Sequence, residues 1–119
     1  MHLVTGGAFQ GKLEYAKNAF GLADSDIFEC SEDCAPDFNA RCICHYERYV
    51  MYCMRAGLKP KTAFPEDTLI IMDDVFCGVV PADPELRAWR ESCGRALTAC
   101  AAGSKTVTRL FCGIPKRLK

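Results

Sequence analysis

The sequence lacks the features that mark nucleic-acid binders and membrane proteins. Its 119 residues carry 15 basic and 15 acidic side chains, so the formal net charge is zero. A general nucleic-acid binder needs a surplus of lysine and arginine to displace counterions. No apolar run approaches the ~20 residues that span a bilayer, and no basic segment followed by an apolar stretch resembles a secretory signal. We therefore expect a cytoplasmic protein without a membrane or nucleic-acid partner.

Cysteine, by contrast, is abundant, with nine copies. In a reducing cytosol such thiols behave mostly as small apolar groups, and we expect no disulfides. Zinc modules usually present two tight cysteine pairs, and no C-x-x-C pair occurs here. Several possible ligands nevertheless lie close together in the chain, so a zinc-binding module remains an alternative. These residues are Cys30, Cys34, Cys42, Cys44 and His45.

Short apolar runs alternate with helical periods, and no repeat or linker divides the chain. This alternation predicts a single α/β domain over residues 1–119, a three-layer sandwich around a small, mostly parallel sheet. The strand at Thr68–Met72 is continuous in apolar character and should be central. The other expected strands are His2–Thr5, Ile27–Phe28 and Val107–Cys112, with a loop at Glu29–Asn39 and a basic tail at Lys116–Lys119.

Three helices are expected between these strands. The first begins at Lys12 and ends at Gly21. Apolar spacing from Ala40 to Ala56 predicts a second, amphipathic helix, although Arg41–Cys44 could equally open this segment as a strand. Asp83 can cap the third helix, with Pro84 in its first turn. The buried stripe of this helix should comprise Leu86, Trp89, Cys93, Leu97 and Cys100.

The loop after the first strand has the spacing of a phosphate loop, two glycines separated by four residues and followed by lysine. The N–H groups of such a loop can face an anion, and the following helix adds the positive end of its dipole. Lys12 would reach the β and γ phosphates of GTP or ATP. A glycine-rich turn with an incidental lysine is the alternative. The expected nucleotide-binding residues are Gly6, Gly7, Ala8, Phe9, Gln10, Gly11, Lys12 and Leu13.

Magnesium would have an incomplete set of protein ligands. Leu13 stands where a Ser or Thr hydroxyl normally ligates Mg²⁺. Nucleotide binding is therefore expected to survive better than phosphoryl transfer. Asp73 and Asp74 follow the central strand, where carboxylates hold metal beside a phosphate loop, and both are candidate Mg²⁺ ligands.

Two regions carry a resemblance to a known family. The first is residues 3–12, and the second runs through residues 74–81, Arg87, Arg90, residues 94–95 and residues 112–119. They resemble the adenosylcobinamide kinase/adenosylcobinamide-phosphate guanylyltransferase family of cobalamin biosynthesis, with its E-V-G-x-G-I-V-P and R-x-x-R-x-x-x-G-R patterns. The chain departs from the family in its shorter middle, in Asp74 for glutamate and in Phe76 for the first glycine of the signature.

The resemblance implies a phosphate-loop NTPase fold of the RecA-like type. It also implies a transferase that phosphorylates cobinamide and then transfers GMP from GTP through a guanylylated histidine. His45 aligns with the last histidine of the family's A-R-x-x-H-H motif. In a helix, Arg41 and Arg48 would share the face of His45, favour a neutral, nucleophilic imidazole and bind the α-phosphate. Lys12 and His45 are thus the candidate catalytic residues.

Further expectations follow from the same resemblance. Arg87, Arg90 and Arg95 would contact substrate or nucleotide phosphates, although a solvated basic face is the alternative. The partners would be a nucleoside triphosphate, a corrinoid and further copies of the chain in a homo-oligomer, a trimer. A second candidate function is a nucleotide-binding module that has lost catalysis and acts as a regulatory or partner subunit. Leu13 and the short middle favour that candidate.

Overall fold

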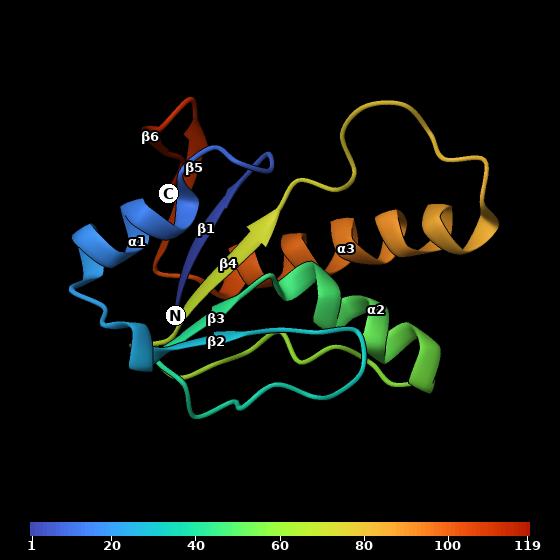
Figure 1. Ribbon diagram of the computed structural model, residues 1–119, viewed down its shortest axis with the longest axis horizontal. Coiled ribbons are helices and arrows are strands. Elements are labelled where there is room, and N and C mark those ends of the chain that lie inside the picture. Colours follow the sequence, from blue (N-terminus) through green and yellow to red (C-terminus); the bar gives the residue numbers. More distant parts are fainter.

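The computed structural model describes residues 1–119 as a six-stranded sheet with helices on both faces (Figure 1). The order of strands is β2-β3-β4-β1-β5-β6, and only the β5–β6 pair is antiparallel. The apolar strand β4 lies between β1 and β3, as its sequence predicts. The strands are β1 (His2–Gly6), β2 (Ile27–Glu29), β3 (Cys42–Cys44), β4 (Leu69–Asp73), β5 (Thr106–Phe111) and β6 (Ile114–Arg117).

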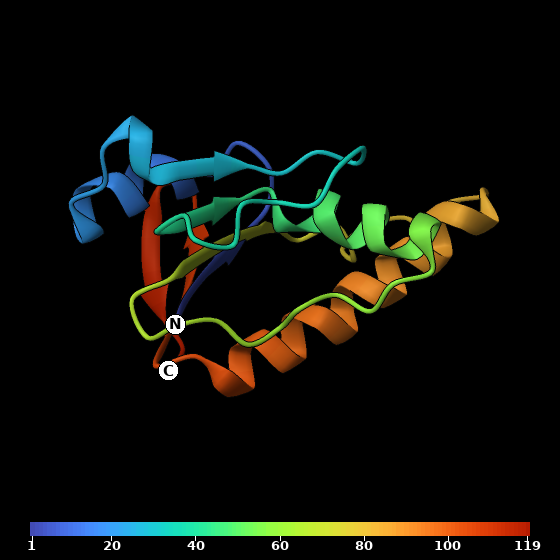
Figure 2. The same ribbon diagram turned by 90° about the horizontal axis from the view of Figure 1, so that it is seen from below.

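Helices cover the sheet from both sides and so form the expected α/β sandwich. Helix α1 (Lys12–Phe20) packs on one face, while α2 (Tyr46–Ala56) and α3 (Pro84–Gly103) pack on the other (Figure 2). Alternate residues of β4 divide between the two cores, with Leu69 and Ile71 toward α1 and Ile70 and Met72 toward α2 and α3. A short 3₁₀ turn spans Asp24–Asp26. None of the helices has the length and apolar character needed to cross a membrane.

The helix-terminus signals hold for α1 and α3. Gly21 ends α1 in the left-handed region, with φ 62°. Asp83 caps α3, because its side chain accepts a hydrogen bond of 2.8 Å from the Glu85 N–H. Of the predicted stripe on α3, Cys93 and Cys100 are fully buried and Trp89 and Leu97 pack against the core. Leu86 is exposed instead, since it lies at the outer end of the helix beyond the sheet.

The expected helix from Ala40 is wrong over its first residues, and the strand alternative is correct. Cys42–Cys44 form β3, which is fully buried between β2 and β4. His45 then adopts a left-handed conformation, and α2 begins at Tyr46. A strand of only this length has too few residues to display a period of two, so the helical period behind it dominated the sequence pattern.

The C-terminal segment is a strand, so the expectation of a simple basic tail is wrong. Strand β6 pairs back onto β5, with Phe111 opposite Ile114. The two residues between the strands, Cys112 and Gly113, have φ 51° and 74°. Positive φ at both central residues is the requirement of a type I′ hairpin turn.

Candidate functional site

The candidate site lies where the carboxyl ends of β1, β3 and β4 meet. The chain leaves β1 toward α1 on one face, and it leaves β3 and β4 toward α2 and α3 on the other. Ligands of open α/β sheets bind in the crevice that such a divergence creates. Here a pocket of about 380 Å³ is lined by residues 8–14, Cys44, His45, Arg48, Ile71 and Asp73.

The loop of residues 7–11 presents free backbone donors to this pocket. Gly6 enters the loop with φ 148°, and a Cβ at this position would lie 2.5 Å from the Leu110 carbonyl oxygen. Gly11 has φ 86° and caps α1 without a side-chain hydrogen bond. The backbone N–H groups of residues 7–14 donate no hydrogen bond within the chain. Unpaired amides at the start of a helix form a binding surface for an anion.

The hairpin of β5 and β6 supports this loop from one side. The Gln10 carbonyl accepts a hydrogen bond of 3.0 Å from the Gly113 N–H, and its side-chain oxygen accepts one from the Cys112 N–H. Phe9, at the tip of the loop, has φ 58° and is fully exposed. The loop therefore has a fixed base and an exposed tip.

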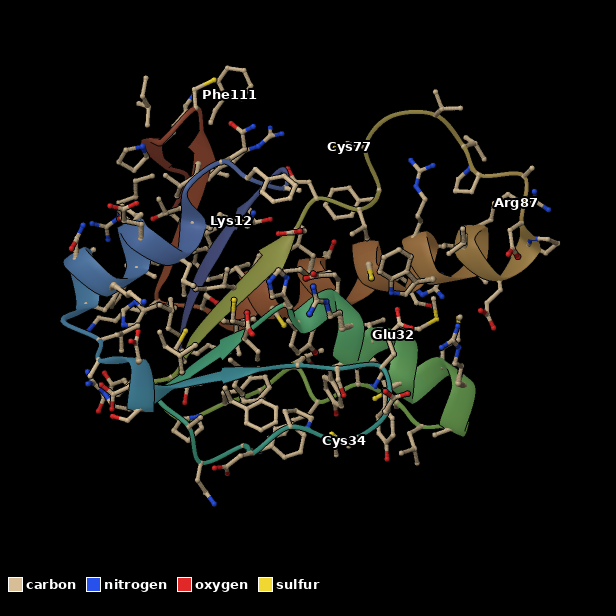
Figure 3. The ribbon with its side chains drawn as sticks, viewed as in Figure 1. Lys12, Glu32, Cys34, Cys77, Arg87 and Phe111 are labelled. Atoms are coloured by element: carbon tan, nitrogen blue, oxygen red, sulfur yellow. The ribbon has the colours of Figure 1, made fainter.

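Lys12 lies at the start of α1 (Figure 3), and its side chain is almost completely buried. Its Nζ donates a hydrogen bond of 2.6 Å to the Gly7 carbonyl and lies 2.7 Å from Asp73 Oδ1. A buried ammonium group requires such partners, because transfer out of water is costly for an unpaired charge. An incoming phosphate would meet Lys12 already paired with a carboxylate.

The two adjacent aspartates point to opposite faces of the sheet. Asp73 lies on the α1 face, in the pocket. Asp74 accepts a hydrogen bond of 2.7 Å from the Thr5 hydroxyl and lies 3.1 Å from Arg109. Since successive side chains of a strand alternate in direction, only Asp73 faces the loop and Lys12.

His45 is held by carboxylates. Its Nδ1 lies 3.0 Å from Glu47 Oε1, and its Nε2 lies 3.7 Å from Glu29 Oε1. Glu47 is buried, and its second oxygen accepts a hydrogen bond of 3.1 Å from the Asp73 N–H. One buried carboxylate thus connects the candidate nucleophile to the strand that carries the candidate metal ligand.

Sequence reasoning missed Glu47 and Glu29. A signal was present for Glu47, an acidic residue two positions after the candidate histidine and on the apolar face of the following helix. None was present for Glu29, because its approach to His45 depends on the pairing of β2 with β3.

Arg41 does not accompany His45, which corrects the expectation of a shared helix face. It precedes β3 and therefore lies at the opposite end of that strand from His45. There its guanidinium lies 3.2 Å from Asp26 and donates to the Phe20 carbonyl. Arg48 alone of the two expected arginines lines the pocket.

None of the three α3 arginines lines this pocket, and two of them bind the segment before the helix. Arg87 donates to the Pro81 and Ala82 carbonyls at 3.0 and 2.7 Å, and Figure 3 places it far from Lys12. Arg90 donates to the carbonyls of residues 76 and 79, both at 2.7 Å. Arg95 forms an exposed ion pair with Glu91 at 2.9 Å. Two of the three thus stabilise the loop of residues 76–82.

The cysteine cluster suggested by the sequence is divided by the sheet. Cys42 and Cys44 lie in the core under α1, Cys30 lies in the opposite core, and Cys34 is exposed. Burial raises the pKa of Cys30 and Cys42 to about 12 and that of Cys44 to about 11. These thiols are therefore neutral, and Cys44 is the one cysteine grouped with His45 among the candidate metal-binding clusters.

No family model matches the chain, and no curated protein matches it.

Proposed function

We propose that this protein binds a purine nucleoside triphosphate, GTP or ATP, on the loop of residues 7–12. The observation that carries the proposal is the combination of free N–H groups at residues 7–14 with a buried lysine in the same pocket. Backbone donors that need no reorganisation, the positive end of α1 and the Lys12 charge all favour a polyphosphate. The strand–loop–helix context is the one in which the glycine and lysine spacing carries this meaning.

Asp73 is the proposed ligand of the Mg²⁺ that accompanies the nucleotide. Its carboxylate faces the pocket and is 20% exposed, so water and phosphate oxygens could complete the coordination. Mg²⁺ in nucleotide sites keeps several waters and needs only one or two carboxylates, and the donor set here fits that requirement despite Leu13. When bound, the ion would neutralise phosphate charge. Asp74 contributes indirectly, by joining β4 to Thr5 and Arg109.

We further propose a transferase of the adenosylcobinamide kinase/guanylyltransferase type with a RecA-like phosphate-loop fold. His45 Nε2 would attack the α-phosphorus of GTP, forming an N–P bond as the bond to the pyrophosphate oxygen breaks and pyrophosphate leaves. Glu47 supports this role, because an Nδ1–H donated to its carboxylate leaves the Nε2 lone pair free. A cobinamide phosphate would then accept the GMP group.

A binding module without catalysis is the second candidate. Leu13 removes the usual hydroxyl ligand, and Arg87 and Arg90 are occupied with backbone carbonyls. Such a protein would bind nucleotide and form no covalent adduct. The two candidates therefore differ in one measurable property.

The test is incubation with GTP radiolabelled on its α-phosphate, followed by denaturing electrophoresis. The transferase predicts an acid-labile label that is lost in His45→Asn. His2→Asn should keep the label, because His2, the other histidine, bonds to Thr106 at the amino end of β1, away from the carboxyl-end pocket. Calorimetry with both nucleotides and Mg²⁺ tests binding itself. If nucleotide binds but no label forms, the binding module without catalysis is the supported candidate. If no binding occurs at millimolar nucleotide, both candidates are refuted.

Lys12→Met provides the second arm of the test. A hydrogen bond to a charged group contributes about 1.5–3 kcal/mol, so nucleotide affinity should fall by roughly 10- to 100-fold. An unchanged nucleotide affinity would refute the proposal that nucleotide binds on the loop of residues 7–12.

A further inference from the structure

Three donor atoms of different chemistry meet at the carboxyl ends of β2 and β3. The ligand atoms of Glu29, Cys44 and His45 all lie within 4.8 Å of one another. Glu29 and Cys44 are partners in the parallel β2–β3 register, so their side chains share the α1 face of the sheet. The Nε2 of His45 lies 3.7 Å from the nearer Glu29 oxygen.

The backbone of His45 is what brings its ring to these neighbours. A continuing strand would direct the residue after Cys44 to the opposite face. His45 instead has φ 56° and ψ 45°, a left-handed conformation that non-glycine residues adopt rarely and often at functional sites.

Glu47 determines which ring nitrogen is available. Its buried carboxylate lies 3.0 Å from Nδ1 and can accept a hydrogen bond from the Nδ1–H, and in that tautomer Nε2, 3.7 Å from Glu29, carries the free lone pair. Metal-bound histidines typically donate their second ring N–H to a carboxylate in this way. The structure therefore contains both a histidine able to bind a metal, His45, and the carboxylate that orients its ring, Glu47.

We propose that Glu29, Cys44 and His45 form a site for Zn²⁺, oriented by Glu47. Sulfur, imidazole and carboxylate donors suit zinc, whereas Mg²⁺ prefers oxygen alone. Tetrahedral zinc places such ligand atoms about 3.3–3.6 Å apart. The Glu29 side chain is exposed and therefore has the freedom to approach the other two ligand atoms. Three protein ligands leave a fourth position for water, and the Cys44 thiol releases its proton to solvent on binding.

The alternative set of His45, Glu47 and Asp73 is less suited to a metal. Both Glu47 oxygens already accept hydrogen bonds, one from the His45 side and one from the Asp73 N–H. A metal bound by His45 Nδ1 and Glu47 would displace the contact between these two groups.

The zinc site goes beyond the proposed nucleotide function and does not depend on it. Because His45 Nε2 has a single lone pair, it cannot bind Zn²⁺ and attack a phosphate at the same time. Zinc is thus expected to block covalent labelling by GTP. Neither Lys12 nor the loop of residues 7–11 belongs to the metal site, so the two activities can be lost separately.

The test uses Co²⁺ as an optical probe of the reduced, metal-free full chain. Bound cobalt should produce a thiolate charge-transfer band in the near ultraviolet and intense tetrahedral bands in the visible, with one ion per chain. Added Zn²⁺ should displace it. Cys44→Ser should abolish the charge-transfer band, and Glu29→Gln and Glu47→Gln should weaken binding, the latter by about 10- to 100-fold.

Matched controls separate this site from other thiols and from misfolding. Cys34→Ser removes an exposed cysteine outside the set and should leave the spectrum unchanged. Glu29→Gln alters an exposed side chain, so its effect does not depend on a tolerant core. Lys12→Met should bind Co²⁺ normally even if nucleotide binding fails. Absence of the band at millimolar Co²⁺, its persistence in Cys44→Ser, or its loss in Cys34→Ser would overturn the proposal.

Discussion

The ion pair of Lys12 and Asp73 provides the most direct quantitative test of the site. Asp73→Asn keeps the shape of the side chain but removes the charge that lies 2.7 Å from a 7%-exposed ammonium group. Removing one partner of a buried ion pair destabilises a protein by about 3–5 kcal/mol. Asp73 is 20% exposed, so water replaces part of the lost interaction. We therefore expect a loss of about 2–3 kcal/mol in the free energy of unfolding.

A double-mutant cycle identifies the cause of that loss. Lys12→Met combined with Asp73→Asn removes both charges, and the double variant should recover most of the stability lost in Asp73→Asn. Urea unfolding can be followed by the fluorescence of Trp89, the single tryptophan, whose indole donates to the Glu47 carbonyl. The reasoning is refuted if Asp73→Asn lowers the free energy of unfolding by less than about 1 kcal/mol. It is also refuted if the double variant is no more stable than the Asp73→Asn single variant.

Bound nucleotide should restore stability to the Asp73→Asn variant. In the absence of Mg²⁺, a bound triphosphate supplies Lys12 with a counterion, and in this variant the phosphate does not have to compete with the Asp73 carboxylate for Lys12. Ligand at a hundred times its dissociation constant stabilises by about 2.7 kcal/mol, which corresponds to roughly 10 °C in Tm for a domain of this size. The rise in Tm at equal nucleotide concentration should be larger for Asp73→Asn than for the unmodified protein. An equal or smaller rise would contradict the proposed competition.

Three further predictions concern the loop, the thiols and Glu47. Gly6→Ala should reduce stability by roughly 2–5 kcal/mol in urea unfolding, because its Cβ meets the Leu110 carbonyl at 2.5 Å. Gly94→Ala is the control, because it lies within α3 without a positive φ and its Cβ meets nothing within 4 Å, so it should not lose stability. Burial raises the pKa of Cys30 and Cys93 from 9.0 to about 12, so these thiols ionise in the unfolded state before they do so in the folded state. The free energy of unfolding should therefore fall between pH 9 and pH 12, by up to roughly 1.4 kcal/mol per pH unit for each thiol. Urea midpoints measured with reductant would show this fall. Glu47→Gln should slow covalent labelling by GTP and leave nucleotide affinity near normal; calorimetry showing a parallel loss of affinity would assign Glu47 a purely structural role.

The ends of the longer elements were predictable because their signals are local. Gly21 ends α1 and Asp83 caps α3 through contacts with residues only a few positions away. The apolar run of β4 identified the central strand for the same reason, since a strand covered on both faces needs apolar residues throughout. The position of Lys12 at the start of a helix also followed from local spacing.

The errors occurred where the outcome depends on distant partners. Strand β3 is stabilised by β2 and β4, and β6 by β5, so neither has a distinctive pattern of its own. Once β3 replaced a helix, Arg41 moved to the far end of the strand from His45. Arg87 and Arg90 of α3 donate to carbonyls of the preceding loop, an arrangement that their spacing in the sequence does not predict.

The sequence by itself therefore determined an alternation of strands and helices, a glycine-rich loop between the first strand and the first helix, and the positions of one lysine, one histidine and two aspartates. Tertiary structure decided which of these residues meet. The pleat of β4 directs Asp73 toward Lys12 and Asp74 toward Arg109, and the pairing of β2 with β3 brings Glu29 to His45. These contacts join residues distant in the chain, and they depend on the order and register of strands, which backbone hydrogen bonds between segments set and no local pattern records.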